Sequence, residues 1–470
     1  MKNNNLYLMF VTMVATLGGL LFGYDTAVIS GTVKYLDLNF IVPLGLDETS
    51  GSSLLGFLVS SALIGCVVGG LIGGFMATKF GRKRSLILAA VMFIVSAVGS
   101  AFPEMAMGGN AEVHTFIVSF VVYRIIGGVG VGLASMLSPM YIAEMAPASR
   151  RGSLVSWNQF AIIFGMLVVY FVNYSIAISG DEVWIATTGW RMMFLSEVIP
   201  ASLLLVLVMF VPESPRWLVM RGEENKAIAI IRKVTGEQDV SAEIASIKES
   251  IGGVVKSRLF AFGVGVIVVG VLLSVFQQFV GINVVLYYAP EIFRNMGMGT
   301  DAALLQTIIV GAINLTFTVV AIFTVDHFGR KPLMIIGSLG MAASMTVLGL
   351  VFYSQNMGIS ALVAMLFYTA SFAVSWGPVC WVLLSEIFPN KIRGQAMAIA
   401  VASQWVANYL VSWTFPMMDK SSYLIDMFHH GFAYWVYAAC GILSALFIWK
   451  FVPETKGKTL EQMNNLFRKK

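Results

Sequence analysis

The chain has 470 residues, of which 58% are hydrophobic and only 12% are charged, and its mean hydropathy is +0.82. Soluble domains carry about 25% charged residues, so this composition excludes an ordinary water-soluble protein of the same length. The net charge of +5 and the isoelectric point near 9.0 would suit a nucleic-acid-binding protein, but the basic residues form short clusters between apolar runs. We therefore expect a protein that lies in a lipid bilayer and has no nucleic-acid partner.

Apolar runs recur along the whole chain. A helix needs roughly 20 apolar residues to cross a bilayer core of about 30 Å, and twelve runs meet or approach that length. They cover residues 8–31, 54–78, 85–102, 116–142, 154–176, 191–211, 260–289, 302–325, 333–353, 359–387, 395–417 and 431–451. The first run is longer than a signal-peptide core and no cleavage motif of small residues accompanies it, so we expect it to remain as the first span.

One extended polar stretch, residues 212–258, separates the first six runs from the last six. Its alternating charges predict short surface helices. We therefore expect a six-helix bundle over residues 1–211, a helical cytoplasmic insert over residues 212–258, and a second six-helix bundle with a short tail over residues 259–470. Motifs that recur at a nearly constant separation indicate that the bundles are copies of one unit. The pairs are Lys79–Lys83 with His327–Lys331, Glu144–Gly152 with Glu386–Gly394, and Val211–Ser214 with Val452–Thr455.

Charge alternates between the two sets of loops. The positive-inside rule places loops rich in lysine and arginine in the cytoplasm, and it predicts that both termini and the insert lie there. The basic loops contain Lys79, Arg82, Lys83, Arg84, Arg150, Arg151, Arg330, Lys331, Lys391 and Arg393. The opposite loops contain Asp37, Asp47, Glu48, Glu104, Glu112, Asp181, Glu182, Asp301 and Asp426.

Acidic residues accompany the basic ones at the cytoplasmic helix ends of both halves. Orientation signals and solvation of helix ends are one explanation, but the positive-inside rule does not ask for a glutamate at the same place in each repeat. A network of salt bridges between the bundles, formed when the cytoplasmic side is closed, explains the glutamates better. This predicted cytoplasmic latch consists of Arg82, Glu144, Arg151, Glu213, Arg330, Glu386, Arg393 and Glu454.

Seven motifs in order along the chain carry a family resemblance. They are GGLLFGYDTAVISG (18–31), the repeated FGRK, YRIIGGVGVGLASMLSPMYIAE (123–144), PESPRWL (212–218), FQQFVGINVVLYYAP (276–290), WGPVCWVLLSEIFP (376–389) and PETKGKTLE (453–461). Together they resemble the sugar porter family of the major facilitator superfamily. The resemblance implies an all-α integral membrane fold with twelve transmembrane helices in two bundles. It also implies proton-coupled uptake of a monosaccharide by alternating access, with D-xylose the first candidate and D-glucose a competitor or second substrate.

Three amides, Gln277, Gln278 and Asn283, lie in an otherwise apolar run beside Gly281, which permits local unwinding of a helix. Interhelical hydrogen bonding would explain any one buried amide. Three amides around a glycine suit a polyol better, because each carboxamide offers a donor and an acceptor to sugar hydroxyls. The family resemblance implies sugar contacts at these three positions and also at Gln159, Tyr287, Asn314, Trp381 and Gln404.

Ionisable residues also lie inside the predicted spans. Asp25 in the first run and Arg124 in the fourth are each the other's natural partner, and charged residues within a membrane are functional candidates. A purely structural ion pair is the alternative. An acid that takes up a proton when its arginine moves away is what proton coupling requires, and Glu197 in the sixth run is a second candidate acid.

Three other classes of protein stay open at this point. A sugar uniporter would share the same sugar site, but related facilitators tend to carry asparagine where this chain has Asp25. A non-transporting sugar sensor would normally have a long signalling tail. A membrane enzyme lacks support, because we find no nucleophile, carboxylate dyad, cofactor motif or metal-ligand cluster. We expect a monomer, and we expect Met166, which replaces a glutamine of a similar porter, either to face lipid or to make one wall of the pathway less polar.

Overall fold

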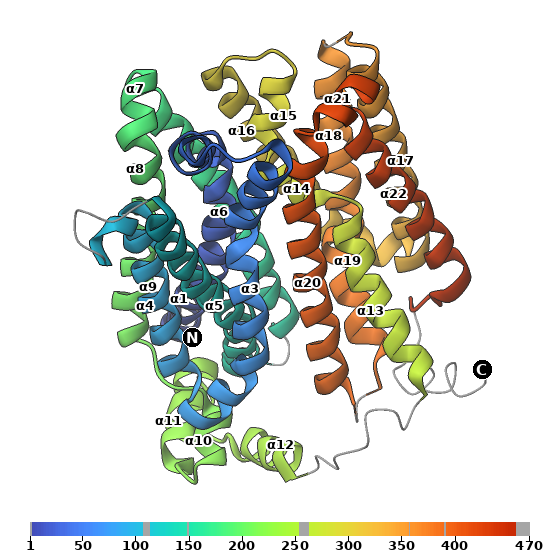
Figure 1. Ribbon diagram of the computed structural model, residues 1–470. Coiled ribbons are helices and arrows are strands. Elements are labelled where there is room, and N and C mark those ends of the chain that lie inside the picture. The colour runs from blue at the N-terminus through green and yellow to red at the C-terminus, as the bar shows by residue number, and fades with distance from the viewer. Residues whose placement is uncertain are drawn as a thin grey trace.

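The structure is a computed structural model that describes residues 2–106, 113–147, 150–252, 263–356, 358–389 and 392–456. All regular secondary structure in these residues is helical. The helices form two bundles that stand side by side, with three short helices beneath the first bundle (Figure 1). We call the end of the bundles beside these three helices the insert side, and the opposite end the far side.

The first bundle, which we call the N-bundle, is built from the elements between Lys2 and Met209. They are α1 (Lys2–Val28), η1 (Ile29–Gly31), α2 (Val33–Leu36), η2 (Asp37–Ile41), η3 (Val42–Leu44), α3 (Glu48–Phe80), α4 (Arg82–Ala101), η4 (Pro103–Ala106), α5 (Val113–Met145), α6 (Arg151–Ala177), α7 (Glu182–Trp184), η5 (Ile185–Gly189), α8 (Trp190–Leu195) and α9 (Val198–Met209). The sixth span begins at Glu182 rather than at residue 191, because π-helical turns at η5 continue α7 into α8.

The insert and the second bundle, the C-bundle, follow. The insert consists of α10 (Pro215–Met220), α11 (Glu224–Thr235) and α12 (Ser241–Gly252). The C-bundle consists of α13 (Val264–Phe279), α14 (Ile282–Tyr287), α15 (Ala289–Asn295), α16 (Thr300–Phe328), α17 (Arg330–Tyr353), α18 (Ile359–Val374), α19 (Trp376–Ile387), α20 (Arg393–Asp419), α21 (Ser422–Phe428) and α22 (Phe432–Phe451). Lys391 of the predicted basic loop and most of the predicted tail lie outside the described residues.

Eleven helical segments of the described chain are long and apolar enough to cross a membrane. The twelfth span, α20, has 27 residues, and its polar Gln404 and Asn408 lower its apolar content. Large apolar side chains cover the outer faces of the bundles, as at Ile199 and Ile359, which are 75% and 80% exposed. Such faces are stable only against lipid.

Two helices of the C-bundle are broken in the middle of their spans. The seventh span stops at Phe279 and resumes at Ile282, and Gly281 between them has a φ of +92°, which favours glycine. The predicted unwinding at Gly281 is therefore confirmed. The tenth span breaks at Ser375, because Pro378 lies in the first turn of α19 and its ring excludes a continuous helix with α18.

Glycines bring α3 and α5 into close contact within the N-bundle. A Cβ added to Gly128 would lie 1.8 Å from the Ala62 carbonyl oxygen, and one added to Gly65 would lie 2.0 Å from the Ile125 carbonyl oxygen. Small residues let helix backbones approach in this way in membranes. The glycine-rich run around Gly128 therefore packs a helix and does not resemble a phosphate-binding loop in structure.

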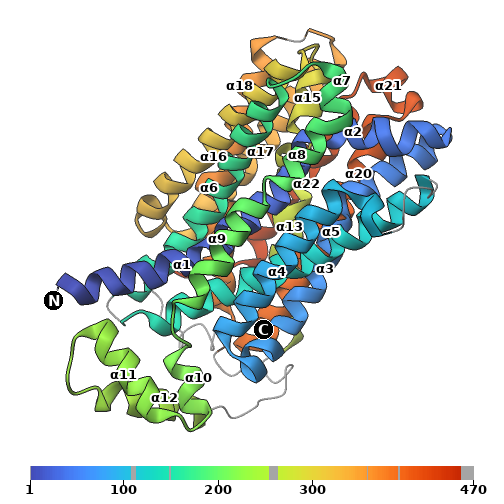
Figure 2. The same ribbon diagram turned by 90° about the vertical axis from the view of Figure 1, so that its left-hand side faces the viewer.

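The insert packs beneath the N-bundle (Figure 2). A small apolar core that includes Leu218, Ile231 and Ile244 holds its helices together. The Lys233 ammonium lies 3.9 Å from the centre of the Tyr7 ring, which ties α11 to the start of α1. The predicted surface helices are therefore present, and they contact the N-bundle in this structure.

Candidate functional site

The amides predicted to contact sugar gather at the break between α13 and α14. Asn283 Nδ2 donates to Gln278 Oε1 at 2.5 Å, and Gln278 Nε2 donates to Gln277 Oε1 at 3.4 Å. Gln277 and Gln278 are 3% and 5% exposed. The unwound Val280–Gly281 segment brings side chains from two helices into one polar cluster, as happens where broken helices of transporters form binding sites.

The second helix break faces the first. Gln277 Nε2 donates to the carbonyl oxygen of Trp376 at 3.0 Å, directly after the break at Ser375. The Tyr368 hydroxyl of α18 donates to the Val280 carbonyl oxygen at 2.7 Å. Breaking a helix leaves backbone carbonyls without intrahelical partners, and in a membrane these must be satisfied. Tyr368 therefore satisfies the Val280 carbonyl at the first break, and Gln277 is anchored to the backbone beside the second break.

Tyr287 joins this region through residues that sequence reasoning missed. Asn408 Nδ2 donates to the Tyr287 hydroxyl at 3.4 Å, and Ser412 Oγ donates to Asn408 Oδ1 at 3.1 Å. All three side chains are buried. Gln404, Asn408 and Ser412 follow one another at intervals of one helical turn, and this spacing of polar residues on one face of α20 could have identified them.

The other four predicted sugar contacts come from helices around the cluster. Gln159 lies on α6, Asn314 on α16, Trp381 on α19 and Gln404 on α20. Asn314 is 3% exposed, and the buried Gln404 Oε1 has no hydrogen-bond partner among the described residues. None of the four forms a hydrogen bond with the amide cluster in the described part of the chain. The structure therefore joins Gln277, Gln278 and Asn283 in one hydrogen-bonded cluster. Tyr287 lies one turn after Asn283 on α14 and bonds instead to Asn408, and the other four predicted contacts lie on the surrounding helices.

Met166 is 8% exposed and lies on α6. Its backbone nitrogen lies 3.1 Å from the position of a Cβ on Gly23 of α1. Of the two alternatives for Met166, the one in which it faces lipid is wrong, because the close approach of α1 and α6 buries it in the N-bundle.

Asp25 and Arg124 form an ion pair inside the N-bundle. Arg124 Nη1 donates to Asp25 Oδ1 at 2.8 Å, and Arg124 Nη2 donates to the Asp25 backbone carbonyl at 3.3 Å. The side chains are 0% and 2% exposed, and the Phe194 ring lies 5.5 Å from the guanidinium carbon. A pair so far from water persists only because each charge balances the other.

Glu197 lies beside this pair. It is 0% exposed, and it interacts electrostatically with both Asp25 and Arg124. The Glu197 carboxyl lies within hydrogen-bonding reach of the Asp25 carboxyl. Apart from that contact, neither Glu197 carboxyl oxygen nor Asp25 Oδ2 has a hydrogen-bond partner among the described residues. Two carboxyls and one guanidinium are neutral together only when one carboxyl holds a proton. The cluster is therefore suited to hold a single exchangeable proton.

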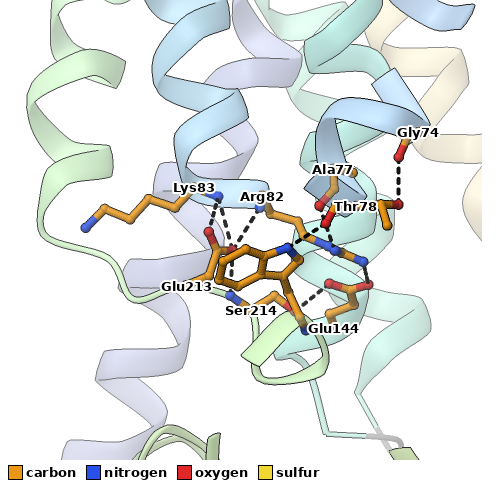
Figure 3. Close-up of polar contacts among 9 residues, drawn as sticks. Gly74, Ala77, Thr78, Arg82, Lys83, Glu144, Glu213 and Ser214 are labelled. Atoms are coloured by element: carbon orange, nitrogen blue, oxygen red, sulfur yellow. Dashed lines mark hydrogen bonds and ion pairs between the residues drawn. The ribbon is translucent and has the colours of Figure 1, made fainter. Parts of the chain in front are cut away.

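On the insert side of the N-bundle, the predicted latch residues join α4, α5 and the start of the insert (Figure 3). Arg82 Nη2 pairs with Glu144 Oε1 at 2.6 Å, and the Ser214 hydroxyl donates to Glu144 Oε2 at 2.5 Å. Glu213 accepts from the backbone N–H groups of Arg82 and Lys83 at 2.9 and 3.1 Å. Glu213 therefore caps the first turn of α4, where N–H groups have no partner in the helix.

The C-bundle repeats this arrangement. Arg330 Nη2 pairs with Glu386 Oε1 at 3.2 Å, and the Thr455 hydroxyl donates to Glu386 Oε2 at 2.5 Å. Glu454 accepts from the backbone N–H groups of Arg330 and Lys331 at 3.2 and 3.0 Å. The repeated sequence motifs therefore correspond to a repeated structure.

The two capping glutamates differ in their acidity. Burial raises the pKa of Glu213 above its usual value, and the hydrogen bonds from backbone N–H groups only partly oppose this. Burial acts in the same direction on Glu454, but the combined backbone hydrogen bonds outweigh it, so the pKa of Glu454 is lowered. Glu213 therefore takes up a proton at a higher pH than Glu454 does.

These pairs differ from the predicted latch in one respect. The prediction was that they join the two bundles, whereas in this conformation the ion pairs of Arg82 and Arg330 each lie within one bundle. Arg151 is exposed, and Arg393 donates its Nε to the Phe388 carbonyl of its own bundle at 3.2 Å. The reason is geometric, since each glutamate lies closer to the arginine of its own repeat.

The polar contacts between the bundles lie on the far side. Among the described residues, hydrogen bonds and ion pairs that join the bundles occur only in that half of the spans. They are Lys420 with Asp37, Ser422 with Glu48, Trp413 with the Ser53 carbonyl, Lys34 with Thr300, and Tyr170 with the Leu286 carbonyl. The protein is therefore closed on the far side in this structure.

The fold and site define a class of protein. The molecule has two six-helix membrane bundles, buried amides, a buried ion pair and one closed end. These features are those of an alternating-access transporter of the major facilitator type. Residues 11–467 match the family model described as "Sugar (and other) transporter". The chain belongs to this sugar transporter family, and the predicted fold class is confirmed.

Curated relatives agree over nearly the full length. The chain is 63% identical over 473 residues to the D-xylose-proton symporter of Escherichia coli (strain K12), covering 99% of this chain and 96% of the relative. It is 43% identical over 461 residues to the glucose facilitated diffusion protein of Zymomonas mobilis, covering 97% of each. It is 40% identical over 471 residues to the arabinose-proton symporter of Bacillus subtilis (strain 168), covering 98% of this chain and 96% of the relative. These relatives are transporters and not enzymes.

Solved structures give the same result. The inward-open conformation of the xylose transporter XylE from E. coli matches with a TM-score of 0.89 and 61% identity, covering 98% of this chain and 99% of that one. The complex of XylE with 6-bromo-6-deoxy-D-glucose matches with a TM-score of 0.84 and 63% identity, covering 99% and 100%. The higher score belongs to the inward-open form, which agrees with closure on the far side.

Proposed function

We propose that this protein carries D-xylose together with a proton into a bacterial cell. The observation that carries the proposal is the pair of buried sites in one chain: a cluster of amides at a helix break, and a separate, fully buried Asp25–Arg124 ion pair. A sugar site alone would suit a facilitator. The identity of 63% to a D-xylose-proton symporter supports the choice of substrate and of proton coupling.

The amide cluster is suited to bind the sugar. Gln278 and Asn283 bond to each other in this structure, and a sugar hydroxyl could replace that bond, because each amide keeps a donor and an acceptor. Gln159, Gln277, Tyr287, Asn314, Trp381 and Gln404 complete the proposed site. D-glucose differs from D-xylose by one hydroxymethyl group, so we propose it as a competitor or second substrate.

The ion pair is suited to couple the proton to the conformation. An ionised Asp25 holds Arg124, whereas a protonated Asp25 releases it, and the difference biases which side of the protein opens. Glu197 assists by sharing the proton. A membrane potential of 100 mV is worth about 2.3 kcal/mol per charge, which sustains roughly 40-fold accumulation for one proton.

We propose that the insert side faces the cytoplasm of the bacterial inner membrane and that the structure is the inward-facing state. The basic residues Lys79, Lys83 and Arg84 at that side support the orientation. In the outward-facing state, we propose that the cytoplasmic latch forms between the bundles. Arg393 is available for it, because its buried Nη2 has no partner among the described residues.

The test is uptake of labelled D-xylose into proteoliposomes that hold the purified protein, with and without an imposed inward proton gradient. We expect accumulation above the outside concentration only with the gradient, and competition by unlabelled D-glucose. Uptake that equilibrates but never exceeds the outside concentration would instead identify a facilitator.

A further inference from the structure

Several buried hydroxyl groups have no hydrogen-bond partner among the described residues, and two of them, those of Ser96 and Ser100, lie on α4. The others belong to Ser138, Ser274, Thr318, Tyr434 and Tyr437. A buried helical serine normally donates to the carbonyl oxygen three or four residues earlier. Ser85 of α4 does so to Gly81 at 2.7 Å. Ser96 and Ser100 are 0% exposed, yet neither hydroxyl has a hydrogen-bond partner among the described residues. Their hydroxyls therefore remain available for another group inside the N-bundle.

The duplicated bundle provides an internal comparison. Ser344 of α17 is the sequence equivalent of Ser96 of α4. Each follows the first arginine of its helix, Arg330 or Arg82, by the same number of residues. The Ser344 hydroxyl donates to the Gly340 carbonyl oxygen of its own helix at 2.8 Å. The serine at the equivalent position of the C-bundle therefore has a hydrogen-bond acceptor within its own helix. Of these two equivalent serines, the one without a partner is in the bundle that holds the Asp25–Arg124 pair; elsewhere in the C-bundle, Ser274 also lacks a partner among the described residues.

Ser96 faces that ion pair across a glycine. A Cβ placed on Gly127 would lie 2.3 Å from Ser96 Oγ and 3.3 Å from Asp25 Oδ1, so both oxygens border the same small space. Gly127 is three residues from Arg124 on α5, so it lies on the same face of that helix. Asp25 Oδ2 and the Glu197 carboxyl oxygens are the acceptors of this region, because the two carboxyls contact each other and have no other hydrogen-bond partner among the described residues.

Ser100 lies one turn closer to the far side. Four residues separate it from Ser96, which is roughly 6 Å along a helix and about two hydrogen-bond lengths, so one water can bridge them. The next residue, Ala101, ends α4, and its carbonyl oxygen accepts from Arg191 Nη1 at 2.8 Å. Arg191 also pairs with Glu104 at 2.7 Å, and the Glu104 side chain is 37% exposed. A partly exposed carboxylate therefore marks the far-side end of this row of hydroxyls.

We propose that Ser100 and Ser96 form the path by which the proton travels between the far side and the Asp25–Glu197 acids. The path runs inside the N-bundle, apart from the amide cluster on the C-bundle. The inference deepens the proposed symport and rests on it. Each hydroxyl accepts a proton on an oxygen lone pair and releases its own hydrogen inward. The arriving proton neutralises one carboxylate, and only O–H bonds form and break.

The charged and titratable groups around this path come from every helix that packs on it. They are Asp25 on α1, Cys66 on α3, Tyr123 and Arg124 on α5, Glu197 between α8 and α9, and Arg191 with Glu104 at the entrance. Close helix packing is the competing explanation for small residues on α4, and alanine would serve packing equally well. The two explanations therefore predict different results for a serine-to-alanine change.

The test compares two activities of each variant in proteoliposomes. Exchange of labelled for unlabelled D-xylose moves no net proton, whereas proton uptake driven by added D-xylose requires the path. The variants are Ser96→Ala, Ser100→Ala and Ser96→Thr, which keeps the hydroxyl. Ser344→Ala is the matched control, because it removes a buried serine hydroxyl from the equivalent position of the other bundle.

We expect Ser96→Ala and Ser100→Ala to slow xylose-driven proton uptake by about tenfold, the size expected when one buried hydrogen bond is lost from a barrier. Exchange should keep the parent rate, and Ser96→Thr and Ser344→Ala should behave as the parent. Parent-like proton uptake in both alanine variants, or an equal fall in exchange, would overturn the path. If the parent itself shows no xylose-driven proton uptake, the proposed symport fails instead.

Discussion

Gln278→Ala is the most informative change in the proposed sugar site. Gln278 is 5% exposed, and its amide bonds to Asn283 at 2.5 Å and to Gln277 at 3.4 Å. Its removal deletes one amide that the sugar would contact and leaves the neighbouring amides without that partner. A hydroxyl left unpaired in a buried site costs about 1–3 kcal/mol. We therefore expect the dissociation constant for D-xylose to rise about 5- to 150-fold.

The assay is calorimetric titration of the purified variant with D-xylose. Gln306→Ala is the matched control, because Gln306 is a glutamine on α16 of the same bundle whose buried Oε1 has no partner among the described residues, so it takes no part in the amide cluster. The control should bind D-xylose as the parent does. An affinity of Gln278→Ala within about twofold of the parent, at unchanged thermal stability, would refute the reasoning, because it would show that this amide does not contact the sugar.

Three further changes test other parts of the structure. Lys420→Met removes the far-side ion pair with Asp37; since both side chains are partly exposed, the loss is about 0.2–1 kcal/mol. Spectroscopic distances between far-side labels on the two bundles should then lengthen in part of the population, and an unchanged distribution would show that the pair does not hold the closed state. His430→Gln tests pH dependence. The hydrogen bond that the protonated His430 ring donates to Asp419 raises the pKa of His430, so its stabilisation is fully present below pH 6.5 and is lost as the pH rises through the folded pKa. The melting temperature of the parent should fall relative to that of the variant over this rise, and parallel curves would count against it. Gly281→Ala forces a φ of +92° on alanine, which costs about 1–2 kcal/mol. We therefore expect a lower melting temperature and weaker xylose binding. Parent-like values of both would contradict the helix break.

Much of the architecture was predictable because apolar length and loop charge act locally. Spans, the helical insert and the break at Gly281 all follow from short stretches of sequence. The break at Ser375 could have been predicted too, since Pro378 lies three residues later. Asn408 was harder to predict, because a single amide in an apolar run has a common structural explanation, and only its spacing of one helical turn from Gln404 marks it.

Contacts between distant segments were harder to predict. The latch arginines and glutamates share one side of the membrane, so charge alone could not choose between partners within and between bundles. The structure chooses Glu144 for Arg82 and Glu386 for Arg330, because each pair comes from one repeat. The contact between Asp37 and Lys420 joins positions at opposite ends of the chain, and no local pattern relates them.

Asp25→Asn tests the central claim, that one buried acid couples the proton to sugar movement. Asparagine keeps the shape of Asp25 but cannot take up a proton, and the amide cluster lies in the other bundle. Sugar binding by calorimetry should therefore stay close to the parent value.

The measurement is D-xylose accumulation in proteoliposomes under an imposed proton gradient, with binding measured on the same preparation. We predict that Asp25→Asn binds D-xylose and exchanges it but never concentrates it above the outside level. Accumulation by Asp25→Asn at the parent level would contradict the claim, leave Asp25 as a structural partner of Arg124, and move the coupling role to Glu197.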